Sequence, residues 1–312
     1  MPPKRNLSFI QTMGNASLIS RFSPKPDWLR VQLPTGERYR FLKETLATSN
    51  LHTVCEEAHC PNIGECWGGG TATFMVLGDV CTRGCRFCAV KTGRQGIALD
   101  EEEPNKIAQA VKAMKLEYVV ITSVDRDDLP DQGANHFAHV VRRLKAECEI
   151  LVEVLIPDFR GDVSALRVMA ESKPDVIAHN VETVRRLTPL VRDRRCSYEQ
   201  SLRVLESAKQ MDSNILTKSS IMIGLGETVE ELREVFSDLR SVQVDFLTLG
   251  QYLRPTPKHL EVKEYVSPQV FEELGELAKS YGFQYVASGP LVRSSYKAGE
   301  FFVKSLKQSK ES

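Results

Sequence analysis

The sequence predicts an α/β protein built on an incomplete parallel barrel, and two observations lead to this fold class. After residue 70, short apolar and β-branched runs alternate with amphipathic stretches whose apolar residues recur near the helical period. The apolar runs are almost unbroken, which is typical of parallel strands buried on both faces. Six such units are two fewer than a closed eight-fold barrel needs, so we expect a partial (β/α)6 barrel of the TIM type. A doubly wound open sheet is the alternative.

The periodic segments place the elements along the chain. The expected strands lie at residues 73–78, 118–124, 149–156, 176–179, 215–224 and 246–251. The expected helices include residues 104–114, 134–147, 198–211 and 227–240. Asp162, Ser197 and Ser267 each precede an apolar-periodic run and suit the N-cap position, and Pro268 fits the first helical turn.

The alternation covers only the middle of the chain, so we expect three parts. Residues 1–70 form an N-terminal extension, residues 71–281 form the barrel, and residues 282–312 form a C-terminal extension.

The overall charge gives no sign of a polyanionic partner. The 312 residues carry 41 basic and 41 acidic side chains, so no global field favours nucleic acid or a membrane surface. We interpret Arg192, Arg194 and Arg195 as a solvated helix end. No apolar run is long enough to span a bilayer, and the N-terminus lacks the apolar stretch of a signal peptide. We therefore expect a cytoplasmic protein, whose thiols stay reduced.

Six of the eight cysteines lie between residues 55 and 88, in two triplets. Cys55, Cys60 and Cys66 form a C-x4-C-x5-C run. Cys81, Cys85 and Cys88 form a C-x3-C-x2-C run with an aromatic residue, Phe87, before the last thiol. The other two cysteines, Cys148 and Cys196, are expected to pack as small apolar residues.

Disulfides, a structural zinc site and an iron–sulfur cluster can each explain the two cysteine triplets. Disulfides would need an oxidising compartment. Structural zinc takes four ligands in closely spaced pairs, with His52 or His59 able to complete the first triplet. A 4Fe–4S cubane fits the thiol donors better, and three thiolates leave one iron open to an exogenous ligand, which suits a catalyst.

Polar residues follow several of the expected strands. Ligand sites of parallel barrels gather where the strands finish, so these side chains should meet above one mouth together with the Cys81–Cys88 loop. The candidates for cofactor contacts are Thr122, Ser123, Asp125, Asn180, Glu182, Lys218 and Arg254.

The second triplet, in a loop after the first barrel strand, resembles that of the radical S-adenosylmethionine (SAM) superfamily. The resemblance implies a radical SAM partial barrel in which Cys81, Cys85 and Cys88 hold a 4Fe–4S cluster. In that family the open iron chelates SAM, and an electron from the cluster releases a 5′-deoxyadenosyl radical that takes hydrogen from an unactivated carbon.

The first triplet lies in a segment that closely resembles the auxiliary-cluster motif of lipoyl synthases. Further matching segments lie at residues 70–75, 119–129, 157–161, 179–183, 224–227, 248–253 and 293–296. The resemblance implies a second 4Fe–4S cluster held by Cys55, Cys60, Cys66 and a serine. We assign that serine to Ser295, with Ser294 as the alternative.

The same resemblance implies the reaction and the partners. Sulfur is inserted at carbons 6 and 8 of an octanoyl chain on a carrier lysine, and the auxiliary cluster is consumed as the sulfur source. The carriers would be lipoyl domains of 2-oxoacid dehydrogenase E2 subunits and the glycine cleavage H protein, with flavodoxin or ferredoxin as the electron donor. A biotin-synthase-like sulfur inserter and a non-catalytic iron–sulfur or zinc module are the rival interpretations.

Overall fold

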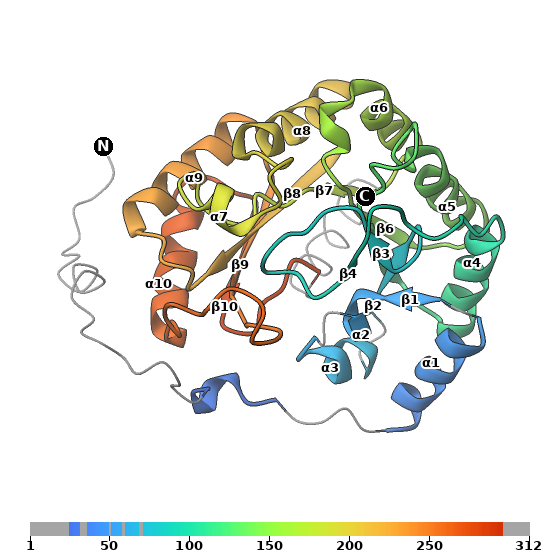
Figure 1. Ribbon diagram of the computed structural model, residues 1–312, viewed down its shortest axis with the longest axis horizontal. Coiled ribbons are helices and arrows are strands. Elements are labelled where there is room, and N and C mark those ends of the chain that lie inside the picture. The colour runs from blue at the N-terminus through green and yellow to red at the C-terminus, as the bar shows by residue number, and fades with distance from the viewer. Residues whose placement is uncertain (1–24, 32–35, 50, 58–59, 69–70, 296–312) are drawn as a thin grey trace, which may run out of the picture.

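The computed structural model describes residues 25–31, 36–49, 51–57, 60–68 and 71–295. Its centre is one curved sheet with the strand order β1-β2-β5-β6-β7-β8-β9-β10, and helices cover its outer face (Figure 1). Neighbouring strands from β2 to β10 are parallel, whereas β1 is antiparallel to β2. The edges β1 and β10 do not pair within the described residues, so the barrel is open there.

The bounds of the elements are as follows. The strands of the main sheet are β1 (His52–Thr53), β2 (Thr71–Val76), β5 (Tyr118–Ser123), β6 (Leu151–Leu155), β7 (Val176–Ala178), β8 (Leu216–Ile223), β9 (Phe246–Gln251) and β10 (Tyr285–Gly289). A small separate pair consists of β3 (Val80–Cys81) and β4 (Lys91–Thr92). The helices before the barrel are η2 (Asp27–Leu29), α1 (Glu37–Thr48), α2 (Val54–Glu57) and α3 (Ile63–Gly68). Those of the barrel are α4 (Glu103–Met114), α5 (Ala134–Glu147), η3 (Phe159–Gly161), α6 (Val163–Glu171), α7 (Thr188–Val191), α8 (Tyr198–Met211), α9 (Val229–Ser241) and α10 (Pro268–Lys279).

The six predicted strands and four predicted helices are confirmed, with bounds that agree to within about two residues. The prediction missed β10, which pairs in parallel with β9 and follows α10. This seventh parallel strand lies in the segment 282–312 that we expected to be an extension, so part of that segment belongs to the sheet.

The predicted helix starts are confirmed by their capping contacts. The Asp162 carboxylate accepts the N–H groups of Ser164 and Ala165, and the Ser197 and Ser267 hydroxyls accept those of Gln200 and Val270. Pro268 is the first residue of α10. Each cap satisfies a backbone donor that the helix itself leaves unpaired.

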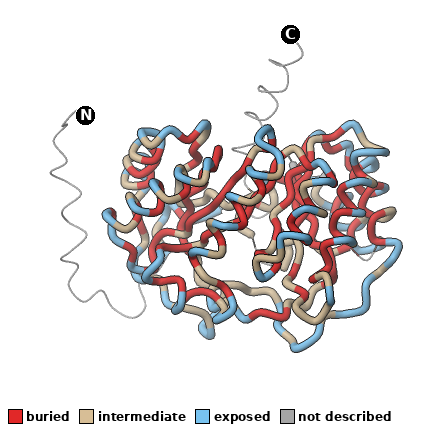
Figure 2. The backbone as a smooth tube through the Cα atoms, turned by 90° about the horizontal axis from the view of Figure 1, so that it is seen from above, coloured by how far each residue is buried: buried red, intermediate tan, exposed pale blue. Residues whose placement is uncertain are grey.

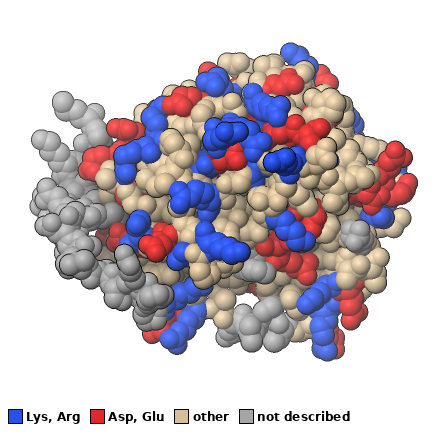
Figure 3. Space-filling model, viewed as in Figure 1, with Lys and Arg blue, Asp and Glu red and all other residues tan. Residues whose placement is uncertain are grey.

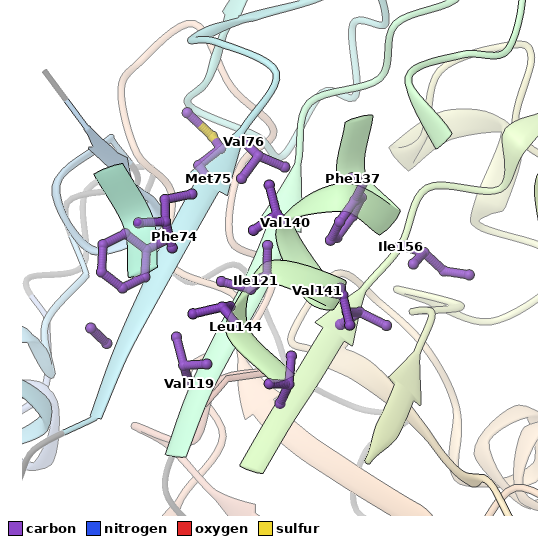
Figure 4. Packing of buried hydrophobic residues seen from close by; sticks show 14 of the residues in the cluster. Phe74, Met75, Val76, Val119, Ile121, Phe137, Val140, Val141, Leu144 and Ile156 are labelled. Carbon is purple, nitrogen blue, oxygen red and sulfur yellow. The ribbon is translucent and has the colours of Figure 1, made fainter. Parts of the chain in front are cut away.

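The core forms a layer between the sheet and the outer helices, where buried residues concentrate (Figure 2). Side chains of α5 point from the helix toward β2, β5 and β6 (Figure 4). Alternation along β5 explains the layering, because Val119 and Ile121 pack against the helices while Tyr118 and Val120 join a small cluster with Val176 and Phe246. No helix in the described part of the chain is long and apolar enough to cross a membrane.

We expect Phe137→Ala to lower the free energy of unfolding by about 3–5 kcal/mol, because the fully buried ring leaves a cavity between α5 and the sheet. Denaturant titration of the apoprotein measures this. The matched control on the same helix is His139→Ala, an exposed position where the change should stay within about 0.5 kcal/mol. Equal effects of the two substitutions would contradict the described packing of α5.

Candidate active site

The Cys81–Cys88 loop begins at the carboxyl end of β2 and is tied to the segment that follows β5. Cys81 ends β3, and the N–H of Thr82 donates to the carbonyl oxygen of Asp125 at 2.9 Å. The N–H of Gly93 donates to the carbonyl of Cys81 at 2.9 Å, so the returning strand β4 holds the other side of the loop. The loop therefore has a fixed position above the barrel mouth.

Arg83 fixes the loop most strongly. Its side chain is only 1% exposed and lies 3.3 Å from Asp125, 3.0 Å from Asp127 and 2.7 Å from Asp158. Burial opposes the charged form, but the hydrogen bond to Asp127 and the carboxylate charges outweigh it and raise the pKa of Arg83. Because these carboxylates follow β5 and β6, the guanidinium joins the loop to two strand ends. Removing one partner of such a buried pair costs about 3–5 kcal/mol.

Asp127 extends this network to two further loops. Besides Arg83, it accepts hydrogen bonds from Arg160 at 2.9 Å and from Arg195 at 3.0 Å. Burial opposes ionisation of the carboxyl, yet the hydrogen bond and charge of Arg83 dominate and hold the pKa of Asp127 below its usual value. Arg160 lies in η3 after β6, and Arg195 lies just before α8. One carboxylate thus connects loops that follow four strands.

The thiols of the second triplet are surrounded by N–H donors. Cys81 Sγ accepts from the N–H groups of Arg83 and Asp125, both at 3.4 Å, and Cys85 Sγ accepts from that of Asp193 at 3.3 Å. Burial and the charge of Asp125 raise the pKa of Cys81 to about 12, so without metal this thiol is protonated. Donors aimed at the sulfur atoms suit thiolates bound to metal, because they stabilise the negative charge.

Four of the predicted strand-end residues lie at this mouth. The Asp125 carboxylate lies 3.6 Å from Cys81 Sγ. Burial raises the pKa of Cys88, and the charges of Glu182 and Asp125 raise it further, so both carboxylates lie near that thiol. Asn180 donates to Glu182 at 3.1 Å, and Ser123 ends β5. Two buried oxygens, Ser123 Oγ and Asn180 Oδ1, have no hydrogen-bond partner.

The other three predicted contacts are occupied within the protein. The Thr122 hydroxyl donates to the carbonyl of Leu155 at 2.9 Å. Arg254 donates to the carbonyls of Pro257 and His259 in its own loop. The expected position of Lys218 at the mouth needs correction. This residue is the third of β8, and its ammonium group forms a buried ion pair with Glu153 of β6 at 2.8 Å.

Arg192 is a functional candidate that the sequence analysis misassigned. The expected solvated helix end is wrong here, because the residue is only 7% exposed. Its Nη1 donates to Ser201 Oγ at 2.6 Å, whereas Nε has no partner, and no described carboxylate forms an ion pair with it. Burial raises the pKa of Glu182 while the charge of Arg192 lowers it, which places the guanidinium beside the mouth.

A buried histidine fixes the position of Arg192. His179 Nδ1 lies 2.9 Å from the carbonyl of Ile156 and must donate to it, so Nε2 accepts from Ser201 Oγ at 3.0 Å. Burial and the charge of Arg192 lower the pKa of His179 to about 4, which keeps the ring neutral. Ser201 can then donate to His179 and accept from Arg192. The cluster of Arg192, Arg194 and Arg195 looks uniformly polar in the sequence, so it does not show that Arg192 is buried.

Cys196 lies among polar groups, although the sequence predicts that it packs as a small apolar residue. Arg83 Nη1 lies 3.3 Å from its sulfur. A hydrogen bond with Cys85 lowers the pKa of Cys196 to about 7 against the effect of burial. This thiol therefore adjoins the second triplet.

The first triplet precedes β2 in the sequence and lies close to the segment that follows β10. Cys55 belongs to α2 and Cys66 to α3, and the N–H of Cys60 donates to the carbonyl of Cys55 at 3.0 Å. Burial and the nearby Cys60 raise the pKa of Cys55 to about 11. Asn62 Nδ2 donates to the carbonyl of Leu291 at 2.6 Å and so ties the segment before Ser295 to the triplet.

Arg293 is a partly buried cation near the first triplet. Burial lowers its pKa, while the charge of Cys60 raises it, so the guanidinium lies near that thiol. Its Nη1 donates to the carbonyls of Pro290 and Val292, whereas its buried Nη2 has no partner, and no described carboxylate pairs with it. Ser294 and Ser295 follow directly and are partly buried.

None of the eight cysteines forms a disulfide. His52, one candidate for completing a zinc site, lies 3.7 Å from Glu57, and His59 lies outside the described residues. Within the described residues, no three Cys, His, Asp or Glu side chains converge closely enough to hold a single metal ion. A cubane does not need this convergence, because each thiolate binds its own iron.

Comparison with known proteins identifies the family. Residues 75–239 match the model of the radical SAM superfamily, and residues 18–60 match that of the N-terminal domain of lipoyl synthase. A lipoyl synthase of Anaeromyxobacter sp. (strain Fw109-5) is 59% identical over 280 residues, which are 90% of this chain and 95% of that protein. One of Myxococcus xanthus is 60% identical over 283 residues, covering 90% and 95%, respectively. The chain belongs to the lipoyl synthase family. It is therefore a sulfur-inserting enzyme of the radical SAM superfamily, whose cofactors are a 4Fe–4S cluster and SAM.

More distant structures share the fold of this lipoyl synthase family member. Methylornithine synthase superposes with a TM-score of 0.54 at 16% identity, over 81% of this chain and 72% of that one. The hydrogenase maturase HydG of Carboxydothermus hydrogenoformans gives 0.58 at 14% identity, over 69% and 52%. These likenesses confirm the partial barrel predicted from the sequence.

A relative in Arabidopsis thaliana, 58% identical over 288 residues that cover 90% of this chain and 73% of that protein, is described as chloroplastic.

We expect Arg192→Gln to weaken SAM binding at least about thirtyfold, because the guanidinium would pair with the methionyl carboxylate of SAM. Losing one partner of such a buried charge pair costs about 2–5 kcal/mol. Equilibrium dialysis against the anaerobically reconstituted protein measures this, with iron content unchanged. Arg203→Gln, an exposed arginine on α8, is the control. An unchanged affinity in the Arg192 variant would show that this guanidinium does not bind the cofactor.

Proposed function

We propose that Cys81, Cys85 and Cys88 hold the SAM-binding 4Fe–4S cluster. The fixed loop above the mouth and the N–H donors aimed at Cys81 and Cys85 support this assignment. When bound, the cluster and SAM supply a 5′-deoxyadenosyl radical able to take hydrogen from an unactivated carbon. The residues of the chain hold the thiolates, orient the cofactor and keep water from the mouth.

The unpartnered buried groups support a SAM site at the same mouth. Buried polar atoms are almost always hydrogen-bonded, so Ser123 Oγ, Asn180 Oδ1 and Arg192 Nε each call for a ligand. The methionyl carboxylate of SAM suits the Arg192 guanidinium, since charge-assisted hydrogen bonds of this kind are strong. Glu182 and Asp125 offer acceptors for the amino and ribose hydroxyl groups. Thr122, Lys218 and Arg254 are not part of this proposal, because their polar groups are already bonded.

We propose a second cubane, consumed as the sulfur-donating substrate, on Cys55, Cys60, Cys66 and Ser295. The support is the guanidinium of Arg293, which lies near Cys60, has a buried Nη2 without a hydrogen-bond partner and pairs with no described carboxylate. A buried cation is costly without a counter-charge, and an anionic cluster supplies one. A serine alkoxide is a harder donor than thiolate, which suits a cluster that must be dismantled.

The three sequence segments would divide this work. Residues 1–70 supply the first triplet, residues 71–281 supply the barrel and its mouth, and residues 282–312 supply Ser295 in addition to β10. The strands β1 and β10 do not pair with each other within the described residues, and the acyl chain would reach the mouth between these two edges.

The proposed reaction inserts sulfur at carbons 6 and 8 of an octanoyl group carried on a lysine. The octanoylated partners would be lipoyl-carrier proteins, namely lipoyl domains of 2-oxoacid dehydrogenase E2 subunits and the glycine cleavage H protein. Flavodoxin or ferredoxin would supply electrons, and a cytoplasmic location would keep the thiols reduced.

Anaerobic turnover with an octanoylated carrier tests this function. We expect Ser295→Ala to abolish dithiolane formation and to leave 5′-deoxyadenosine production largely intact, since the radical is made at the other triplet. Mass spectrometry follows both products. Ser294→Ala is the matched control and should retain both. Full dithiolane formation by the Ser295 variant would refute the ligand assignment.

A further inference from the structure

The loops around the mouth carry cations that nothing in the described protein neutralises. Arg86 lies in the Cys81–Cys88 loop, Arg194 follows α7, and Lys258 lies in the loop after β9. All three side chains are exposed, and none forms an ion pair with a described residue. We call these three residues the basic rim. Figure 3 shows Lys and Arg side chains across the middle of this face, with acidic side chains between them.

The loops of the basic rim contact one another. The N–H of Arg86 donates to the carbonyl of Val191 at 2.9 Å, and its Nη1 donates to that of Leu190 at 3.2 Å. The N–H of Leu260 donates to the carbonyl of Arg86 at 3.2 Å. The three loops therefore form a continuous surface beside the second triplet.

Neighbouring carboxylates do not cancel the charge of the rim. Asp193 pairs with Arg195 at 2.8 Å, and Asp127 is shared among three guanidinium groups. The loop after β9 carries two exposed acids, Glu261 and Glu264, beside the exposed bases Lys258 and Lys263. Together with Arg86 and Arg194, the exposed bases of this surface outnumber these two acids. Exposed charges of one sign steer a partner of the opposite sign and fix its orientation.

An exposed apolar residue lies next to one of these cations. Leu190 is 49% exposed, and its carbonyl accepts the Arg86 guanidinium. A cavity of about 260 Å³, lined by Thr188, Pro189, Arg194 and Cys196 among others, opens next to it. Protein interfaces commonly combine exposed apolar side chains with charged and polar ones.

We propose that the basic rim, together with Leu190, docks an acidic surface of the protein domain that presents the octanoyl-lysine. This inference rests on the proposed function. A side chain carried on a folded domain can enter the mouth only if that domain lies against the surrounding loops. Negative charge on the domain beside the lysine then brings the acyl chain to the second triplet.

The test compares a folded octanoylated carrier domain with a short octanoyl-lysine peptide that lacks acidic residues. We expect Arg194→Glu combined with Lys258→Glu to raise KM for the domain about tenfold or more and to leave kcat and the peptide kinetics unchanged. Raising the ionic strength should lower kcat/KM of the wild-type protein for the domain alone. Iron content and 5′-deoxyadenosine yield with the peptide confirm that the site is intact.

The control combines Lys173→Glu, between α6 and β7 at the opposite end of the barrel, with Arg203→Glu on the outside of α8. This variant should behave as wild type. An unchanged KM for the domain in the rim variant would overturn docking, and so would rim-dependent binding of duplex DNA in preference to the domain. Failure of the wild-type protein to convert either octanoyl substrate would instead refute the proposed function.

Discussion

Arg83 carries its charge inside the protein, two residues after the first thiol of the radical triplet, and the arrangement of the mouth depends on it. Three carboxylates from the ends of β5 and β6 surround the guanidinium, and one of them, Asp127, also binds Arg160 and Arg195. Because breaking a buried ion pair costs several kcal/mol, about 3–5, the Cys81–Cys88 loop is held firmly in place by this guanidinium. The thiols are thereby held where the parallel strands end, as the open iron of a radical SAM cluster requires.

Two other cations, the buried Arg192 and the partly buried Arg293, pair with no described carboxylate, and each lies beside one cysteine triplet. Arg192 adjoins Glu182 at the second triplet, and Arg293 adjoins Cys60 at the first. An uncompensated guanidinium costs folding free energy until an anion arrives, so the loaded sites should stabilise the chain as well as perform chemistry. Arg83, which only positions the loop, is paired with three carboxylates. Arg192 and Arg293, which we propose bind the SAM carboxylate and an anionic cluster, each have one buried nitrogen without a partner.

Much of this architecture was predictable from local patterns. Apolar runs and helix caps at Asp162, Ser197 and Ser267 placed the strands and helices, because burial on two faces and unpaired helical N–H groups leave direct marks in a sequence. The short strand β10 was missed, since its run is brief and lies near the end of the alternation. The prediction that Lys218 lies at the mouth is wrong because its ammonium group pairs with Glu153. That residue is on β6, which is separated from β8 by β7, and the sequence does not show this proximity. The prediction of a solvated Arg192 fails for a related reason. Its hydrogen bond to Ser201, which also bonds His179, arises only in the folded chain and leaves no local pattern in the sequence.

The central claim is that the two triplets hold two different clusters, and that only the Cys81–Cys88 cluster cleaves SAM. The most direct measurement is 5′-deoxyadenosine release under dithionite from two anaerobically reconstituted variants. One has Cys55, Cys60 and Cys66 replaced by alanine, and the other has Cys81, Cys85 and Cys88 replaced. The account predicts about four irons in each variant, with release of 5′-deoxyadenosine by the first and none by the second. Release by the variant that lacks Cys81, Cys85 and Cys88 would contradict it.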